Sequence, residues 1–359
     1  MKEDIKKVFF LGAGFSKAIN KSYPLMKDLS LLVKDKIGQF KPVLDTYYDT
    51  EIADAMKNNI ENLLTYLSSN FPFKNDVQQA MNVALYKAIV KILSDFFIEK
   101  SSECFADEVW FRKLDSFADF VVNNNVNIIT LNYDVLLESI IETAFLRNEF
   151  DIDIHECYKY PFVWMGHRYR MTSKTEIHED EFFKCNSRTI PFPIERQNKI
   201  LSILKLHGSA NWFWGGINPT DPIYYKNWSF DTTKEIDYGL IPYIIPPVLD
   251  KNSFYNHIAL KYLWGEAHKL LENADEIYIV GFSFPQTDLA VRFLFQSALR
   301  KSSAQIYVIN SASRDKLKEN YEQAFGERKL HYDYTDSEDA LQEFIKDKLK
   351  EISYRNEQL

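Results

Sequence analysis

The chain has 359 residues, a length that fits one large domain with insertions or two domains. Its formal net charge is -8 and it contains no basic run, which argues against direct nucleic-acid binding, because duplex affinity comes largely from neutralised phosphates. No apolar run approaches the roughly 20 residues that span a bilayer, and the charged N-terminus lacks the apolar length of a signal peptide. We therefore expect a cytoplasmic protein without membrane contact.

The cysteine and aromatic content indicate which structural supports and which assembly state to expect. The cysteines, Cys104, Cys157 and Cys185, form no C-x-x-C pair, so we expect no structural zinc, no other metal and no disulfide scaffold. Aromatic residues make up 15% of the chain, which predicts a sizeable core and favours self-association. A homo-oligomer is therefore expected.

The first third of the chain predicts one strand followed by helices. Val8-Phe9-Phe10-Leu11 is a short apolar run that ends in glycine, as in a buried parallel strand, and a helix is expected to follow it. Residues 26–125 show helical spacing only, for example at Ile60, Leu63 and Leu67. We interpret this segment as a helical insertion.

The remaining two thirds alternate strands with helices. Strands are predicted at 127–131, 201–206, 277–280 and 306–309, and helices at 135–145, 256–271, 287–300 and 337–352. Thr335 and Glu338 predict a capping box for the last helix. Residues 150–200 suggest an irregular or β-rich insertion, and residues 210–245 have the order of a loop. The expected fold is α/β, a Rossmann-like parallel sheet flanked by helices, with a core formed by residues 1–25 and 126–359.

Polar motifs follow each predicted strand. Gly12-Ala13-Gly14-Phe15-Ser16 stands between a strand and a helix, where glycines let the backbone approach a pyrophosphate. Lys17 stands where the dehydrogenase fingerprint has a third small residue, so a turn selected for packing alone remains an alternative. In Thr130-Leu131-Asn132-Tyr133-Asp134, Asn132 can bond ribose hydroxyls, and Asp134 can accept from a carboxamide or merely cap the next helix.

The later strands end in similar motifs. His207 in Lys205-Leu206-His207-Gly208-Ser209 can act as a base near neutral pH, although a lone histidine is more often structural. Gly281 and Ser283 follow the next strand, and Asn310 closes the last one and suits an adenosine ribose. Because strand ends of a parallel sheet share one edge, these motifs are expected to meet.

The order of the motifs, GAGxS, TxNxD, LHGS, VGFS and VIN, resembles the sirtuin family over roughly residues 6–25 and 126–332. The resemblance implies an NAD-binding Rossmann sheet in which His207 is the base and Asn132 orients the nicotinamide ribose. It also implies phosphate contacts at the first turn and adenosine contacts at the last two motifs. The nucleotide-binding residues implied are Gly12, Ala13, Gly14, Phe15, Ser16, Asp134, Gly281, Ser283 and Asn310.

The chain departs from sirtuin deacylases in three respects. It has no four-cysteine zinc ribbon, and Leu131 replaces the glutamine before Asn132. Its first motif continues as Ser22-Tyr23-Pro24-Leu25-Met26, where deacylases have Gly-Ile-Pro-Asp-Phe-Arg. It looks closer to the divergent bacterial sirtuin-like proteins that hydrolyse NAD in antiphage defence, which the Ile244-Ile245-Pro246-Pro247 stretch also resembles. Only a helix is expected after the last core strand, so this resemblance implies a separate trigger protein, for which a HerA-type ring ATPase is our first choice.

The sequence thus predicts an NAD+ hydrolase that takes NAD as substrate and releases nicotinamide and ADP-ribose. An NAD-dependent protein deacylase and a non-catalytic NAD or ADP-ribose sensor remain alternatives. An NAD-dependent dehydrogenase is disfavoured, because the third glycine is absent and no acidic residue clearly ends a second strand at the usual distance.

Overall fold

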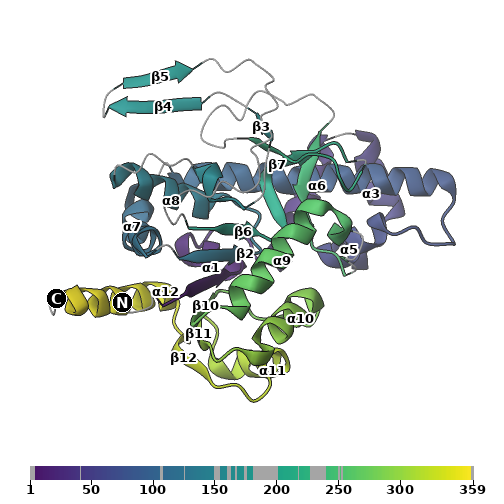
Figure 1. Cartoon of the computed structure of the whole chain (residues 1–359). Helices are drawn as coiled ribbons and strands as arrows, with labels where there is room; N and C mark the ends of the chain where they lie inside the picture. Colours follow the sequence, from purple (N-terminus) through teal and green to yellow (C-terminus); the bar gives the residue numbers. More distant parts are fainter. Residues whose placement is uncertain are drawn as a thin grey trace.

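The computed structural model describes most of the chain (Figure 1). The described residues are 5–40, 42–105, 108–124, 126–148, 154–159, 163–165, 168–173, 176–180, 201–216, 218–226, 240–249, 251 and 254–356. Cys185 and residues 181–200 of the expected insertion therefore lie outside the described residues.

A six-stranded parallel sheet forms the centre of the molecule. Its spatial order is β12-β11-β10-β1-β2-β6, and every neighbouring pair is parallel. Numbered along the chain, the strands lie in the order 3-2-1-4-5-6, which is that of a Rossmann fold. The strands are β1 (Lys7–Leu11), β2 (Asn127–Thr130), β6 (Ile203–Lys205), β10 (Glu276–Val280), β11 (Gln305–Asn310) and β12 (Leu330–Thr335). This sheet confirms the predicted fold class.

Helices cover both faces of the sheet, which explains the uninterrupted apolar run of β1. The ring of Phe9 packs against Phe117 of α7 (Glu108–Asn123) and Phe344 of α12 (Ala340–Asn356), with centroids 5.6 and 5.9 Å away. The ring of Phe10 points to the opposite face and packs 4.9 Å from Phe295 of α10 (Leu289–Ala298). Successive strand residues face opposite ways, so both must be apolar here.

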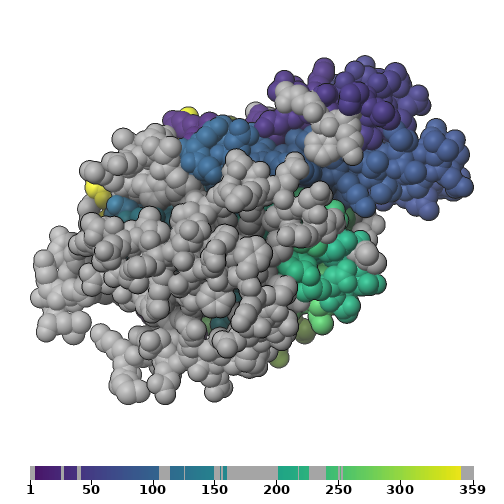
Figure 2. All heavy atoms as spheres, turned by 90° about the horizontal axis from the view of Figure 1, so that it is seen from above, coloured from purple at the N-terminus to yellow at the C-terminus, as the bar shows by residue number. Residues whose placement is uncertain are grey.

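Only helices occur among the described residues between β1 and β2. They are α1 (Ala13–Ile19), α2 (Met26–Phe40), α3 (Pro42–Glu51), α4 (Asp54–Lys57), α5 (Ile60–Ser68), α6 (Asp76–Phe105) and α7. The apolar stripe predicted on α5 is buried, including Ile60, Leu63 and Leu67. Seen from above, the purple and blue residues of α2–α6 gather in a lobe at one side (Figure 2).

The helices of the second half connect the remaining strands. They are α8 (Leu136–Arg147), α9 (Ile258–Glu272), α10, α11 (Arg314–Phe325) and α12. Helix α9 reaches back to β6, because the indole N–H of Trp264 donates to the Leu206 carbonyl at 3.1 Å. Helices α8, α9 and α10 confirm the helical predictions for these segments, with ends that differ by a few residues.

The loop predicted over residues 210–245 is wrong in part: residues 215, 216, 218–223, 240 and 245 have no regular structure, as predicted, residues 217 and 227–239 lie outside the described residues, and the rest forms strands. This segment contains β7 (Gly208–Trp214), β8 (Tyr224–Lys226) and β9 (Ile241–Ile244), which join β3 (Val163–Met165) in a four-stranded sheet of order β3-β8-β7-β9. Trp212, Trp214 and Pro242 lie in these strands, whereas Gly215, Gly216, Pro219 and Pro222 lie in the connection between β7 and β8. The preceding segment contains the hairpin β4 (Arg168–Ser173) and β5 (Glu176–Asp180), in agreement with the β-rich alternative.

The C-terminal capping box is also wrong. Thr335 ends β12, a strand that the sequence did not reveal, and its hydroxyl donates to the Tyr332 carbonyl at 2.9 Å. Glu338 pairs with Lys21 instead of reaching back to a helix start, and α12 begins only at Ala340. Strand β12 is half-buried along its length and alternates Leu, His, Tyr and Asp, which hides it from a search for apolar runs.

Candidate active site

The carboxyl ends of β1 and β10 meet where the strand order reverses, the position at which open α/β sheets bind ligands. The amides of Gly12 and Gly14 donate to the carbonyls of Val280 and Gly281, both at 2.9 Å. A Cβ on Gly14 would lie 2.6 Å from the Gly281 Cα, and Gly281 itself has a φ of +63°. The glycines are thus required for direct backbone contact between the two loops.

The first turn consequently offers less to a phosphate than its sequence suggests. Two of its amides are already bonded to β10, and the Phe15 amide donates to the Gly12 carbonyl at 2.9 Å. The Phe15 side chain packs in the core 5.5 Å from the Phe117 ring, away from solvent. Ala13 is the exposed residue of the turn. Its backbone is the part of the turn best placed to meet a ligand.

Asn132, Ser16 and Asp134 form a directed chain of hydrogen bonds. The side-chain nitrogen of Asn132, Nδ2, lies 3.0 Å from the Gly12 carbonyl and 3.0 Å from Ser16 Oγ. The Ser16 hydroxyl in turn donates to Asp134 Oδ2 at 2.8 Å. A carbonyl oxygen can only accept, so the group facing Gly12 must be the NH2 of Asn132. Its two hydrogens are thereby engaged, and Oδ1 stays available as an acceptor.

Asp134 is held inside this chain. Its Oδ1 accepts the amide of Leu136, the first residue of α8, at 3.2 Å, although Val135 and not Asp134 is the N-cap of that helix, while Oδ2 accepts from Ser16. Burial raises the pKa of the Asp134 carboxyl, and the nearby Lys205 ammonium and the Ser16 bond oppose that rise. The side chain therefore serves both the helix and the turn, and the carboxamide contact stays a prediction.

His207 lies two residues beyond β6, as Asn132 lies two beyond β2, and Thr130 pairs with Lys205 where those strands end. The histidine is buried, and its Nε2 has no hydrogen-bond partner in the described part of the chain. The rings of Tyr133 and Trp264 flank it with centroids 6.5 and 6.4 Å away. The pKa of His207 is lowered to about 3, because burial and, to a smaller extent, Lys251 lower it by more than Asp288 raises it.

Charged groups beside His207 come from parts of the chain that the sequence did not connect with it. Lys251 and Asp288 form an ion pair whose side chains are only 10% and 14% exposed. Glu61 of α5 faces the same pair: burial raises its pKa, Lys251 and a bond to Thr287 lower it, and Asp288 raises it. Nothing in the motifs marked Glu61 or Lys251, because their proximity arises only from tertiary packing.

The loop after β10 is held by side chains that donate hydrogen bonds to its backbone carbonyls. Phe282 O accepts from the Tyr321 hydroxyl at 2.7 Å and from the Asn310 amide at 3.3 Å. Arg292 donates to the carbonyl of Phe284, a buried residue with a φ of 50°. Asn310 therefore supports this loop, whereas the Ser283 side chain is exposed at its surface.

The structure thus brings the predicted residues into two connected groups. Asn132, Asp134 and Ser16 form one, and Gly281, Phe282 and Asn310 form the other. The contact of Gly14 with Gly281 joins them, and Tyr133 links the first group to His207. Within the described residues, no cluster of three or more His, Cys, Asp or Glu side chains could hold a metal ion, and no helix is long and apolar enough to cross a membrane.

Comparison with known proteins gave matches among solved structures only. No family model and no curated protein matches the chain. The structure of Sir2Tm bound to a propionylated peptide is 14% identical with a TM-score of 0.37, covering 98% of this chain and 94% of that one. A Sir2 homologue mutant with ADP-ribose is 13% identical with a TM-score of 0.43, covering 97% and 94%. Likeness at this level assigns no activity, so the function is argued from the residues themselves.

Proposed function

We propose that this protein is an NAD+ hydrolase that cleaves the bond between nicotinamide and ribose C1′. The observation that carries the proposal is the pair of acceptors at the ends of β2 and β6. His207 Nε2 is buried and unpartnered among the described residues, and the orientation of Asn132 Oδ1 is fixed by the two bonds of its NH2 group. The order of the five sequence motifs, with no cysteines for a zinc ribbon, supports the same reaction.

The reaction needs little acid or base. Nicotinamide departs as a neutral molecule when the C1′–N bond breaks, and the ribose passes through an oxocarbenium-like transition state, as in glycoside hydrolysis. The oxygen of a water molecule then bonds to C1′, and one proton is released. The products are nicotinamide, ADP-ribose and a proton. A site for this step must orient the ribose, stabilise a developing positive charge and place one water.

His207 suits this step as a neutral hydrogen-bond acceptor. A pKa of about 3 keeps the imidazole uncharged at neutral pH, so it is a weaker base than an ordinary histidine. Its Nε2, in the tautomer with the hydrogen on Nδ1, accepts from the attacking water or a ribose hydroxyl and passes the proton on to solvent. A buried acceptor without a partner costs free energy, and such a ligand would remove that cost.

Asn132 supplies the second acceptor. Its Oδ1 has a fixed direction, because the Gly12 carbonyl and Ser16 Oγ hold its NH2 group. An oxygen dipole placed in advance stabilises positive charge at C1′ without reorganisation in the transition state. On this proposal the adenosine and pyrophosphate lie over Ala13 and Ser283, at the point where the strand order reverses.

The biological setting that we propose is antiphage defence by NAD+ depletion in the cytoplasm. The support is the sequence resemblance to sirtuin-like defence effectors. We further propose a homo-oligomer that is activated by a separate trigger protein, with a HerA-type ring ATPase as the first candidate. A phage challenge of cells that express the chain with and without such an ATPase tests this role, and equal NAD+ levels in all cultures would contradict it.

The decisive experiment is incubation of the purified protein with NAD+, with and without an acylated peptide, followed by mass spectrometry. We expect nicotinamide and ADP-ribose without peptide. Products that require the peptide would indicate a deacylase, and unchanged but bound NAD+ would indicate a sensor. His207→Ala should lower the rate by about 10²-fold, the lower end of general acid–base effects. Asn132→Ala, which removes a preorganised dipole, should also lower it by about 10²-fold. His268→Ala, which changes a histidine of α9 outside the site, is the matched control.

A further inference from the structure

A buried ion pair lies directly behind the candidate site. Lys205 of β6 is 1% exposed and Glu138 of α8 is 0% exposed, and Nζ lies 2.7 Å from Oε1. The Tyr158 hydroxyl donates to the same oxygen at 2.9 Å. The other carboxylate oxygen, Glu138 Oε2, is buried without a hydrogen-bond partner among the described residues.

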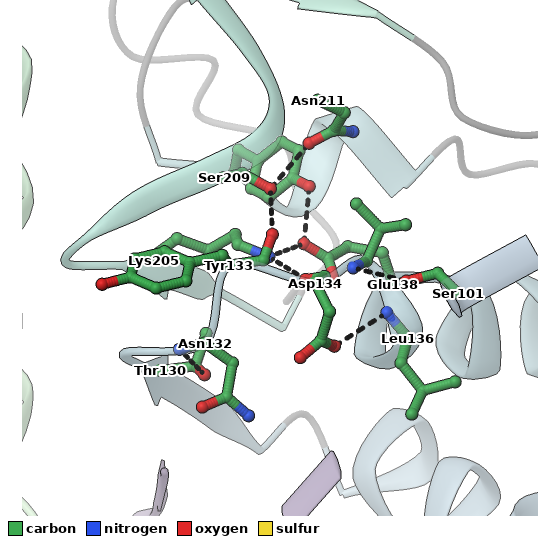
Figure 3. A network of polar contacts seen from close by, with 12 residues as sticks. Ser101, Thr130, Asn132, Tyr133, Asp134, Leu136, Glu138, Lys205, Ser209 and Asn211 are labelled. Carbon is green, nitrogen blue, oxygen red and sulfur yellow. Dashed lines mark hydrogen bonds and ion pairs between the residues drawn. The ribbon is translucent and has the colours of Figure 1, made fainter. Parts of the chain in front are cut away.

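Lys205 makes a second contact, and it is with the site. Its Nζ donates to the backbone carbonyl of Asp134 at 2.6 Å. The preceding carbonyl, that of Tyr133, accepts from the Ala210 amide at 2.8 Å. Figure 3 shows Lys205 reaching across to Asp134 and Glu138, with Asn132 at the start of the same loop. Two consecutive carbonyls of the loop are therefore fixed by residues that flank His207.

These contacts leave Asn132 little freedom. Before the side chain, the backbone N–H of Asn132 donates to Thr130 Oγ1 at 3.1 Å. After it, the carbonyls of Tyr133 and Asp134 accept hydrogen bonds from Ala210 and Lys205. The backbone between these points sets where the Asn132 side chain lies relative to Gly12 and Ser16. A shift of about 1 Å in a catalytic group can cost about 10²-fold in rate, so this anchorage has a direct kinetic consequence.

Stability alone does not explain the pair. Removing two charges from water is expensive, and well-packed apolar residues of similar volume are often as stabilising as a buried ion pair or more so. The unpartnered Glu138 Oε2 adds to that cost. An apolar pair, however, could not donate to the Asp134 carbonyl. The hydrogen bond from the Lys205 ammonium to the Asp134 carbonyl is thus the contribution that an apolar pair could not replace.

We propose that Lys205, held by Glu138, is a positioning residue that sets the Asn132–Asp134 loop for cleavage of NAD+. This inference rests on the function proposed above. Tyr158, through its bond to Glu138, extends the network to the short helix η1 (Ile154–Cys157) and its neighbours. Lys205 acts through the loop and not on the substrate.

The test is the double variant Lys205→Met/Glu138→Leu, which removes both charges and keeps the volume. We expect it to fold, with kcat for NAD+ cleavage lowered about 10- to 100-fold and KM changed by less than about threefold. Hydrogen exchange of peptides covering residues 130–136 should be faster than in the unmodified protein. Lys205→Met alone, which leaves the Glu138 charge buried, should be the less stable protein.

The outcomes separate this inference from the proposed function. A folded double variant with unchanged kcat and unchanged exchange overturns the positioning role, even if the unmodified protein cleaves NAD+. If the unmodified protein does not cleave NAD+, faster exchange in the double variant still supports the anchorage, and unchanged exchange still overturns it. Should the double variant not fold, Lys205→Met/Glu138→Gln keeps an acceptor for Tyr158 and provides the same two measurements.

Discussion

His207 shows how burial changes the chemistry of a single residue. Its pKa in the folded protein, about 3, lies below the ordinary value of 6.5 because burial and Lys251 disfavour the charged form. Between these two values the unfolded chain binds a proton that the folded chain does not. The contribution of His207 to stability is therefore present above pH 6.5 and is lost progressively as the pH falls toward 3.

We predict that His207→Phe will flatten this pH dependence. The unmodified protein should lose up to about 1.4 kcal/mol of unfolding free energy per pH unit more than the variant on acidification below pH 6.5. Urea unfolding of both proteins at several pH values between 4.5 and 8 measures the difference. Parallel stability curves for the two proteins would show that His207 titrates normally.

The side-chain NH2 group of Asn132 is the basis of a second prediction for a single residue. In Asn132→Asp, a carboxylate oxygen replaces the NH2 group that faces the Gly12 carbonyl, 3.0 Å away. Two acceptors would then oppose each other, which we expect to cost about 1–3 kcal/mol of stability. Asn132→Ala only removes the bonds and should be less destabilised. Thermal unfolding ranks the two variants, and an aspartate variant as stable as the alanine variant would show that the NH2 group does not face the carbonyl.

At the scale of elements, the turn at Gly12–Gly14 packs β1 and α1 against the loop after β10, in addition to its proposed role in ligand binding. Gly14→Ala would place a methyl group 2.6 Å from the Gly281 backbone, which cannot move aside as a flexible side chain could. We expect a loss of about 1–3 kcal/mol or more. Gly265→Ala, in the exposed middle of α9 with nothing within 4 Å, should instead gain about 0.5–1 kcal/mol. Melting curves that fail to separate the two variants would refute the close contact.

The elements that the sequence predicted well are those whose signal is local. Strands β1, β2, β6 and β10 are almost fully buried and β11 is mostly buried, and all five read as apolar runs that lead into a glycine-containing or polar motif. Strand β12 is half-buried, β8 and β9 are short, and β7 mixes polar, glycine and aromatic residues, so the sequence of each strand alone does not mark it. A residue-by-residue pattern cannot reveal such strands.

The same distinction holds for the candidate site. His207 and Asn132 follow recognisable strand ends, so their type and place in the sequence singled them out. Lys251 and Asp288 act on His207, and Glu61 acts on that ion pair, only because α5 packs against distant loops, and the sequence contains no marker of that contact. Lys205 belongs to the histidine motif of the sequence, but its partner Glu138 lies in α8 and belongs to none of the motifs. These relations could be found only in the structure.

For the whole molecule, the question is whether the helices inserted after α1 form a separate unit. The contacts argue that they do not. Ser94 of α6, 1% exposed, donates to the Ala210 carbonyl at 2.8 Å, and the Ala210 amide donates to Tyr133 beside His207. The Leu249 amide donates to Thr65 of α5, also at 2.8 Å. The helical lobe is thus two hydrogen bonds away from the site loop.

We therefore predict that Ser94→Ala destabilises the molecule as one cooperative unit. Loss of the hydroxyl leaves the buried Ala210 carbonyl without this donor, which should cost about 1–3 kcal/mol. In urea, helix content by circular dichroism and tryptophan fluorescence should shift together, because α6 unfolds with the core that surrounds Trp212 and Trp264. Ser102→Ala changes an exposed serine on the same helix whose hydroxyl donates to the Ile98 carbonyl, and it should leave both midpoints in place. A shift in helix content alone would show that the lobe unfolds independently, and the site would then not depend on it.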